Sequence, residues 1–262
     1  MFPFSEPCKP EPMIKAFLRS IIPYRYTPSG YVDHLIRKRS GLVVQSGPFK
    51  GMKYINQASG SVFPPKLLGI YEMELHPIFE EMLQHPPERF VDIGAAEGYY
   101  AVGMALRLPA TSEILAFEMD VRARRSLNQL ASRNNVEDRL SIREKCEPQD
   151  LATALRTPKK TFLLCDVEGY EKLLLDPAAV PELRNTSILV EMHDFLVPDV
   201  SELIRQRFEA THEIQVIHET KRTLDQYPYS TLVTQFLPDK YRLWAVGEHR
   251  SVPMHWFWMQ PR

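Results

Sequence analysis

Short apolar runs and longer amphipathic stretches alternate along the middle of the chain. The apolar runs have the length of strands and cover residues 91–93, 114–118, 140–142, 162–165 and 188–190. The stretches between them include residues 99–107 and residues 121–134, and the latter place Leu127, Leu130 and Ala131 on one side, as a helix covering a sheet would. Strands that alternate with helices predict an α/β fold with a doubly wound, mainly parallel, Rossmann-like sheet.

A glycine-containing turn follows the first predicted strand. Gly94 and Gly98 let the backbone turn sharply and approach a ligand closely. A Walker loop would need Lys and then Ser or Thr after its second glycine, where this chain has Tyr99 and Tyr100, so a triphosphate does not fit. A pyrophosphate would be repelled by the two acids beside the turn, Asp92 and Glu97. The turn suits a cationic or amine-bearing ligand such as S-adenosylmethionine (SAM).

Acidic residues stand at the ends of four predicted strands. They are Asp92, Glu118, Asp166 and Glu191. In doubly wound sheets, ligands bind at the carboxyl ends of the strands, so these four side chains should face one crevice. Glu118 follows the glycines by about twenty residues, which is the spacing expected of an acid that binds ribose hydroxyls.

Three motifs have a distinctive order and spacing. They are VDIGAAEGYY at residues 91–100, DVEGYE at residues 166–171 and ILVEMH at residues 188–193. Together they resemble the FkbM-like family of SAM-dependent methyltransferases, over residues 71–195, about half of the chain. The resemblance implies a class I methyltransferase fold with a seven-stranded sheet, SAM as methyl donor and, most often, O-methylation of a small-molecule or sugar hydroxyl.

The same resemblance implies which residues bind the donor. Asp92, Gly94 and Glu97 would contact the methionine end of SAM, Glu118 the ribose, and residues 144–147 the adenine. Glu72 and its neighbour Tyr71 resemble a Tyr-Glu pair that enters the family's donor site. The complete predicted donor set is Glu72, Asp92, Gly94, Ala95, Glu97, Gly98, Tyr99, Glu118, Met119, Cys146 and Asp166.

Asp166 and His193 are the candidate catalytic residues. Alignment of a hydroxyl with a sulfonium methyl group is worth roughly 7 to 11 kcal/mol, and a general base adds about a hundred- to ten-thousand-fold. His193 would take the proton directly, because a histidine titrates near neutral pH. Alternatively, Asp166 and Glu191, with either His193 or Asp194, would hold a divalent cation such as Mg²⁺, which lowers the pKa of the hydroxyl. A structural hydrogen bond made by His193 is the third alternative, and Glu168 and Glu171 fit as first-turn acids of a helix.

Two segments flank or interrupt the predicted sheet. Residues 1–85 form an amino-terminal extension with a proline-rich disordered start, a helix at 13–22 and a short hairpin at 42–54 that would wall the active site. Residues 86–262 form the methyltransferase domain. An insertion at about 219–253 separates a strand at 213–218 from an aromatic strand at 254–259 and would select the acceptor. Its specificity candidates are Tyr227, Tyr229, Tyr241, Arg242, Trp244, His249 and Arg250.

The charge, length and cysteine content of the chain limit the kinds of binding partner that we expect. A formal net charge of -1 argues against a nucleic-acid partner, although the helix at 121–134 has a basic face. The helix at 13–22 is too short for stable membrane insertion, which leaves contact with a membrane surface or packing on the core or on a partner subunit. Cys8, Cys146 and Cys165 have no metal-binding spacing and indicate reduced thiols in a cytoplasmic protein. The oligomeric state is open, with a homodimer the commonest assembly.

The sequence therefore predicts a SAM-dependent O-methyltransferase that acts on a small-molecule acceptor. Enzymes that methylate the amines of nucleic-acid bases usually carry Asn or Asp, two prolines and an aromatic residue after the fourth strand. This chain has DVEG at residues 166–169, which favours a hydroxyl. The alternatives are an N-methyltransferase of a small amine and a non-catalytic, SAM-binding scaffold protein.

Overall fold

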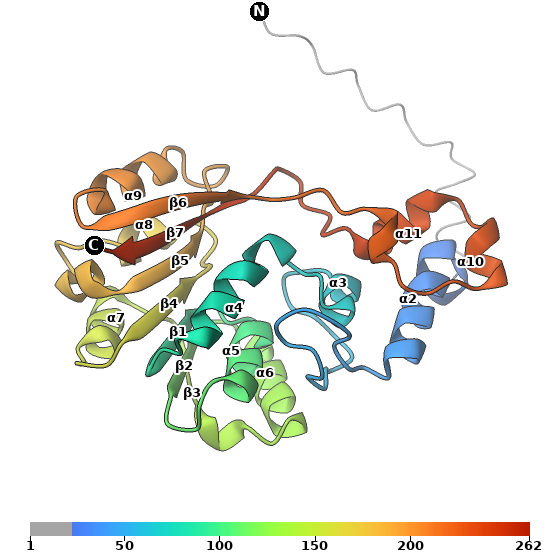
Figure 1. The fold of residues 1–262 in the computed structure, drawn as a ribbon, viewed down its shortest axis with the longest axis horizontal. Coiled ribbons are helices and arrows are strands. Elements are labelled where there is room, and N and C mark those ends of the chain that lie inside the picture. Colours follow the sequence, from blue (N-terminus) through green and yellow to red (C-terminus); the bar gives the residue numbers. More distant parts are fainter. Residues whose placement is uncertain (1–22) are drawn as a thin grey trace, which may run out of the picture.

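The computed structural model describes residues 23–262, which are organised around one seven-stranded sheet (Figure 1). The predicted disordered start and the predicted helix at 13–22 lie outside the described residues. The strands are β1 (Arg89–Ile93), β2 (Glu113–Phe117), β3 (Leu140–Arg143), β4 (Thr161–Cys165), β5 (Ser187–Glu191), β6 (His212–His218) and β7 (His255–Pro261).

The strand order is β3-β2-β1-β4-β5-β7-β6. Strands β1 to β5 pair in parallel, whereas β7 runs antiparallel between β5 and β6. This order, with a late antiparallel strand inserted beside β5, is that of the Rossmann-like class I methyltransferase fold. The predicted fold class is confirmed.

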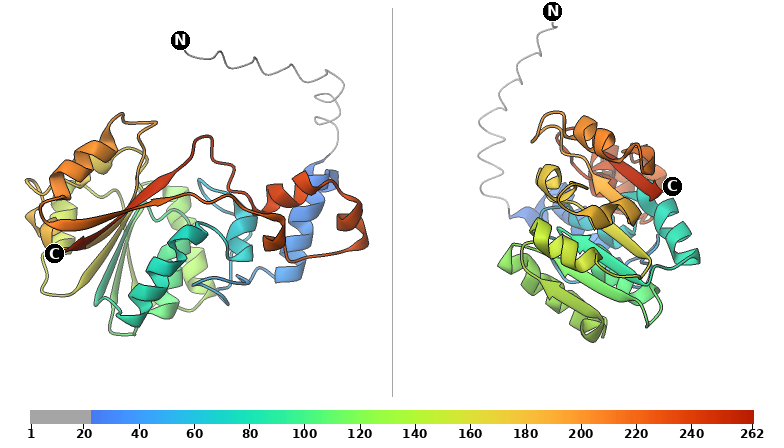
Figure 2. Two further views of the ribbon diagram at one scale, coloured as in Figure 1. Left: turned by 45° about the horizontal axis from the view of Figure 1, so that its top comes forward. Right: turned by 90° about the vertical axis from the view of Figure 1, so that its left-hand side faces the viewer.

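Helices cover both faces of the sheet, as Figures 1 and 2 show. One face carries α4 (His76–Gln84), α5 (Tyr99–Arg107) and α6 (Val121–Arg133), and the other carries α7 (Pro148–Leu155), α8 (Glu171–Leu174) and α9 (Val200–Phe208). Successive side chains of a strand therefore enter different cores: Phe90 packs into the first and Val91 into the second. Burial on both faces explains why the central strands are continuous apolar runs.

The segment before the sheet contains two further helices, α2 (Pro28–Ser40) and α3 (Phe63–Leu68). The predicted hairpin at 42–54 is a loop closed by a single antiparallel bridge between Val43 and Lys53. Val32 of α2 and Phe49 of this loop belong to the same apolar cluster as Phe90 of β1. The boundary at residues 85 and 86 stays a prediction, since this shared core packs the two sides together.

The connection between β6 and β7 carries α10 (Leu232–Phe236) and α11 (Asp239–Val246). Figure 1 shows both beside α2, at the end of the molecule away from α9. Trp244 of α11 meets Tyr24 edge to face, with ring centroids 6.5 Å apart. Short 3-10 helices cover Tyr24–Tyr26, Met73–Leu75, Glu137–Arg139, Pro181–Asn185 and Leu224–Gln226. No helix within residues 23–262 has the length and apolar character needed to span a membrane.

Candidate functional site

A cleft of about 1180 Å³ opens at the carboxyl ends of β1, β2, β4 and β5. Its wall includes three of the four acids that the sequence places at strand ends: Glu118, Asp166 and Glu191. Drug-sized ligands usually occupy about 300 to 1000 Å³, so this cleft has room for more than one small molecule.

Gly94 allows the turn after β1 to touch the end of β4. Its φ is +85°, and a Cβ atom there would lie 1.6 Å from the carbonyl oxygen of Asp166. The amides of Gly94 and Ala95 both donate to the carbonyl of Phe117, at 2.9 and 3.0 Å. The turn is thus held against β2 and β4 at once, with its backbone on the cleft.

Glu118 is fixed at the edge of the cleft by two backbone amides. Its Oε2 accepts from Ala96 N at 2.8 Å, and its Oε1 accepts from Asp120 N at 2.7 Å. Each carboxylate oxygen has a second lone pair, so both can still accept a hydroxyl. This geometry suits the predicted binding of a ribose diol.

Glu97 lies behind the cleft wall rather than on it. It is fully buried, and its carboxylate binds Tyr54 Oη at 2.5 Å, Lys66 Nζ at 2.5 Å and Ser59 N at 2.9 Å. Burial acts to raise the pKa of Glu97, but Lys66 and the hydrogen bonds hold it below its usual value. Ser59 and Lys66 line the cleft, whereas the loop at 42–54 does not. The wall expected from the hairpin is therefore built by the segment after it, which Glu97 anchors.

Asp92 is buried beneath the glycine turn. Its side chain does not line the cleft, and within the described part of the chain its Oδ2 has no hydrogen-bond partner. Burial, reinforced by the nearby Asp166 carboxylate, raises the pKa of Asp92 from 3.8 to about 8. Asp92 is therefore largely protonated at neutral pH.

We expect the Asp92→Asn variant to lose less stability than the wild type as the pH rises. An acid with a raised pKa in the folded state contributes stability that is present below its unfolded pKa, near 3.9 on average for Asp, and is lost as the pH rises toward about 8. Urea unfolding between pH 4 and pH 9 measures this as a smaller slope for the variant. Asp166 and Glu191 also have raised pKa values and leave a residual slope. Identical slopes would contradict the protonated state of Asp92.

A second group of side chains lies across the Gly94 turn from Glu118. It consists of Asp166, Glu191 and His193. Their candidate ligand atoms all lie within 4.8 Å of one another. Burial and then Glu72 raise the pKa of Asp166 to about 6, and burial and then Asp166 raise the pKa of Glu191 well above its usual value. The two carboxyl groups therefore hold a proton at a higher pH than isolated acids would.

Glu171 holds the ring of His193, although the sequence predicted for Glu171 only a place in the first turn of a helix. The ring Nδ1 lies 2.6 Å from Oε1 of Glu171, the first residue of α8. The ring Nε2 lies 3.6 Å from Asp166 Oδ1 and 3.7 Å from Glu168 Oε2. Burial acts to lower the pKa of His193, but the hydrogen bond to Glu171 and the charge of Asp166 outweigh it and raise the pKa.

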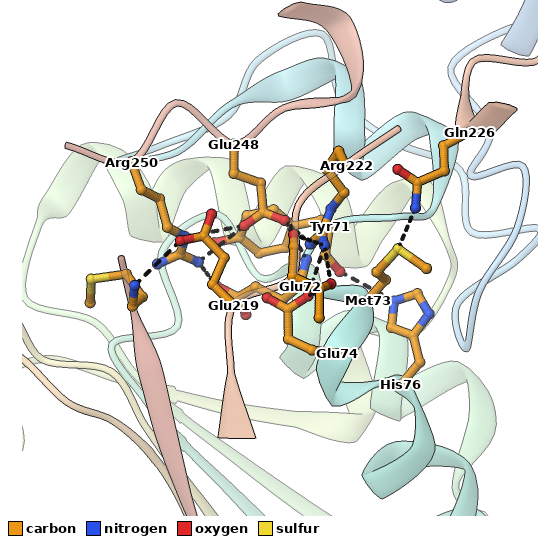
Figure 3. Close-up of polar contacts among 12 residues, drawn as sticks. Tyr71, Glu72, Met73, Glu74, His76, Glu219, Arg222, Gln226, Glu248 and Arg250 are labelled. Carbon is orange, nitrogen blue, oxygen red and sulfur yellow. Dashed lines mark hydrogen bonds and ion pairs between the residues drawn. The ribbon is translucent and has the colours of Figure 1, made fainter. Parts of the chain in front are cut away.

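Buried ion pairs join this region to the segment before α4 (Figure 3). Arg250 binds both Glu72 and Glu191 and lies 3.2 Å from Glu248 Oε2. Arg222 binds Glu248 and lies 2.9 Å from Glu74 Oε2. The network fastens the β6–β7 connection over the cleft edge.

The predicted donor residues divide between the cleft wall and the layer behind it. Those on the wall are Gly94, Ala95, Tyr99, Glu118, Met119, Cys146 and Asp166, and those behind it are Glu72, Asp92, Glu97 and Gly98. Gly98 has a φ of +92° and lets α5 begin close to Leu127 of α6. Burial raises the pKa of the Cys146 thiol to about 12, so this residue packs rather than reacts.

Only two of the seven specificity candidates reach the cleft, His249 and Arg250. The others belong to the distant helices and their loops; Tyr227, for example, packs in the cluster that contains Ala245 of α11. Ser59 and Lys66 also line the wall and were not predicted from the sequence, whereas Lys145 belongs to the predicted adenine segment at 144–147. Ser59 and Lys66 are held by Glu97, but no local pattern connects residues so far apart in sequence.

No family model matches this chain, and no curated protein does. Among solved structures, the O-methyltransferase TomG from Streptomyces achromogenes, involved in tomaymycin synthesis and in complex with SAM, is similar at 11% identity and a TM-score of 0.46, over 95% of this chain and 96% of that chain. An O-methyltransferase from Bacillus cereus in complex with SAH is similar at 11% identity and a TM-score of 0.46, over 95% of this chain and 97% of that chain. The fold assignment rests on the strand order and not on these distant likenesses.

Proposed function

We propose that the protein transfers the methyl group of SAM to a hydroxyl of a small molecule. One observation carries this proposal: Gly94 brings the two halves of a single cleft into contact at the end of β4. One half offers the carboxylate oxygens of Glu118, just after β2, as acceptors for the ribose hydroxyls of a nucleoside. The other half holds Asp166, Glu191 and His193, whose groups can accept a proton or bind a cation.

The first half fits the donor without a phosphate site. The backbone of Gly94 and Ala95 would lie under the methionine portion, Glu118 would accept the ribose hydroxyls, and Met119 and Cys146 would flank the adenine. Asp92 and Glu97 would act from behind, by supporting the turn. The acids on the cleft wall, Glu118 and Asp166, favour the sulfonium and ammonium charges of SAM over a pyrophosphate.

In the second half, His193 would remove the proton of the acceptor hydroxyl. His193 lines the cleft, and its Nε2 is near Asp166 and Glu168, which also line it. Its raised pKa makes it a stronger base than a free imidazole. Alignment of the hydroxyl with the methyl group would supply roughly 7 to 11 kcal/mol, and His193 about a hundred- to ten-thousand-fold more. Asp166 would orient the hydroxyl beside the ring.

A divalent cation is the second candidate for activating the hydroxyl. Two carboxylates and an imidazole within 4.8 Å of one another form a donor set that suits such an ion. Glu191 would share its charge with Arg250, which already binds it. When bound, the cation would lower the pKa of a coordinated hydroxyl.

Three narrower assignments stay proposals. The DVEGYE motif supports an FkbM-like enzyme, because Gly169 has a φ of +98° and the motif's first and last acids both face His193. A cytoplasmic location agrees with Cys146 and Cys165, which are free and buried. A homodimer rests on general frequency alone.

Donor binding is the decisive test. We expect calorimetry to detect SAM and S-adenosylhomocysteine (SAH) binding to the metal-stripped protein, and SAH at a hundredfold excess over its Kd to add about 2.7 kcal/mol of stability. If Mg²⁺ leaves the heat of SAM and acceptor binding unchanged, His193 acts as a direct base; Mg²⁺-dependent binding would favour the cation. If neither SAM nor SAH gives a heat of binding, the methyltransferase proposal is wrong.

We expect Glu118→Ala to weaken SAH binding about ten- to hundredfold. Hydrogen bonds to a charged group contribute about 1.5 to 3 kcal/mol, and about 1.4 kcal/mol corresponds to tenfold in affinity. Glu182→Ala is the matched control, since Glu182 pairs with Arg156 outside the cleft. Equal Kd values for both variants would show that Glu118 does not hold the donor.

A further inference from the structure

Glu171 is a buried acid that the proposed chemistry does not use. It begins α8, and its side chain is fully buried beside His193. The chain reaches this position through a left-handed turn, in which Glu168 has a φ of +51° and Gly169 a φ of +98°. The turn folds Glu171 back toward β4, so that its Oε1 also lies 3.4 Å from Val167 N.

The direction of the hydrogen bond follows from these contacts. Oε1 of Glu171 accepts from the amide of Val167 and, as a carboxylate oxygen, has a further lone pair for a second N–H donor. The partner at 2.6 Å, Nδ1 of His193, is therefore the donor. In the neutral ring, the other nitrogen, Nε2, then carries no proton and presents its lone pair to the cleft.

The burial of Glu171 has a cost that its helix does not offset. Within residues 23–262, Oε2 of Glu171 has no hydrogen-bond partner, and an unsatisfied buried oxygen is unfavourable. Interaction of an acid with a helix terminus requires no burial, and α8 has only four residues. The hydrogen bond to His193 is therefore the interaction that we consider to offset the burial of Glu171.

The other acids that the structure describes around the His193 ring make no hydrogen bond to it. Asp166 from the end of β4 and Glu168 from the turn lie beyond hydrogen-bond distance of Nε2, and Glu191 of β5 lies within the same cluster. The ring of Phe195 lies 5.7 Å from that of His193, centroid to centroid, and limits its rotation from the side. Among the described residues, Glu171 alone makes a hydrogen bond to this ring.

We infer that Glu171 is the positioning residue of the site: its carboxylate fixes His193 as the Nδ1–H tautomer, with Nε2 bare and directed into the cleft. This inference rests on the proposed function. It serves either form of that function, because a general base and a metal ligand both need an unprotonated Nε2. Without Glu171, the ring could turn or carry its proton on Nε2.

The tautomer can be measured directly by long-range ¹H–¹⁵N NMR of the metal-stripped full chain with ¹⁵N-labelled histidine. The chain has eight histidines, and His193→Gln identifies the His193 signals by their loss. Spectra are taken at a pH above which these signals no longer change, where the ring is neutral. The expected wild-type result is the Nδ1–H tautomer, and an Nε2–H ring would overturn the inference without any variant.

Two substitutions separate the hydrogen bond from the charge. Glu171→Gln keeps an acceptor oxygen and should retain the Nδ1–H tautomer, whereas Glu171→Met has similar length but no acceptor and should shift the ring toward Nε2–H. Glu168→Gln removes a charge on the same turn and should leave the tautomer of the neutral ring unchanged. An unchanged tautomer in Glu171→Met that still binds SAH would contradict the role of Glu171. Calorimetry with SAH tests the methyltransferase proposal separately. The methyltransferase proposal and the positioning role of Glu171 can therefore each fail without the other.

Discussion

Gly94→Ala is expected to destabilise the protein by about 2 to 6 kcal/mol and to weaken SAH binding by more than about a hundredfold. A positive φ costs a non-glycine residue about 1 to 3 kcal/mol, and overpacking adds about 1 to 3 kcal/mol. Here the new Cβ atom would lie 1.6 Å from the Asp166 carbonyl oxygen, so β1 and β4 would have to separate at the proposed donor site. Urea unfolding and SAH calorimetry measure the two effects.

Gly41→Ala is the matched control. Gly41 ends α2 with a φ of +59°, and nothing lies within 4 Å of a Cβ atom built there. This variant carries the backbone cost without the clash, so its loss of stability should be smaller and its Kd for SAH unchanged. Equal effects of the two substitutions would show that the close approach to β4 is not what Gly94 provides.

Arg222→Met should destabilise the protein by about 3 to 5 kcal/mol, as the loss of one partner from a buried ion pair generally does. The Arg222 side chain is only 5% exposed and separates the buried carboxylates of Glu74 and Glu248 (Figure 3). Its removal would leave the buried Glu74 without its arginine and Glu248 with Arg250 alone. Thermal and urea unfolding at pH 7 measure the loss.

Arg242→Met is the control that tests whether burial of the ion pair causes the loss of stability in Arg222→Met. Arg242 pairs with Asp239 on α11, where the Asp239 side chain is 60% exposed, and exposed pairs contribute about 0 to 1 kcal/mol. Its expected loss is correspondingly small. If the two arginine variants unfold at the same urea concentration, the network of Figure 3 does not stabilise the fold.

The sheet and one side of the cleft were predictable because their signals are local. A run such as β4 is buried along its whole length, and its residues 162–165 are continuously apolar. Parallel strands end at one edge, which explains why Glu118, Asp166 and Glu191 meet although they come from three strands. Gly94 was identifiable because few other residues tolerate its backbone conformation.

The pairing of buried charges was not predictable, because tertiary contacts decide it. Glu97 has the sequence position of a ligand-binding acid, yet Lys66 occupies its carboxylate from 31 residues away. Arg250 and Glu72 are 178 positions apart. By contrast, α2 was missed despite local signals: Thr27 caps it, Pro28 begins it and Gly41 ends it.

The position of β7 has a consequence for how the chain folds. β7 follows every other strand in sequence, yet it lies between β5 and β6. Until residues 255–261 emerge from the ribosome, β5 is an unpaired edge and β6 has no neighbour. Arg250, which neutralises Glu72 and Glu191, also emerges late. The half of the cleft that holds Glu191 therefore forms late, and a nascent chain exposes an apolar strand edge that invites aggregation during synthesis.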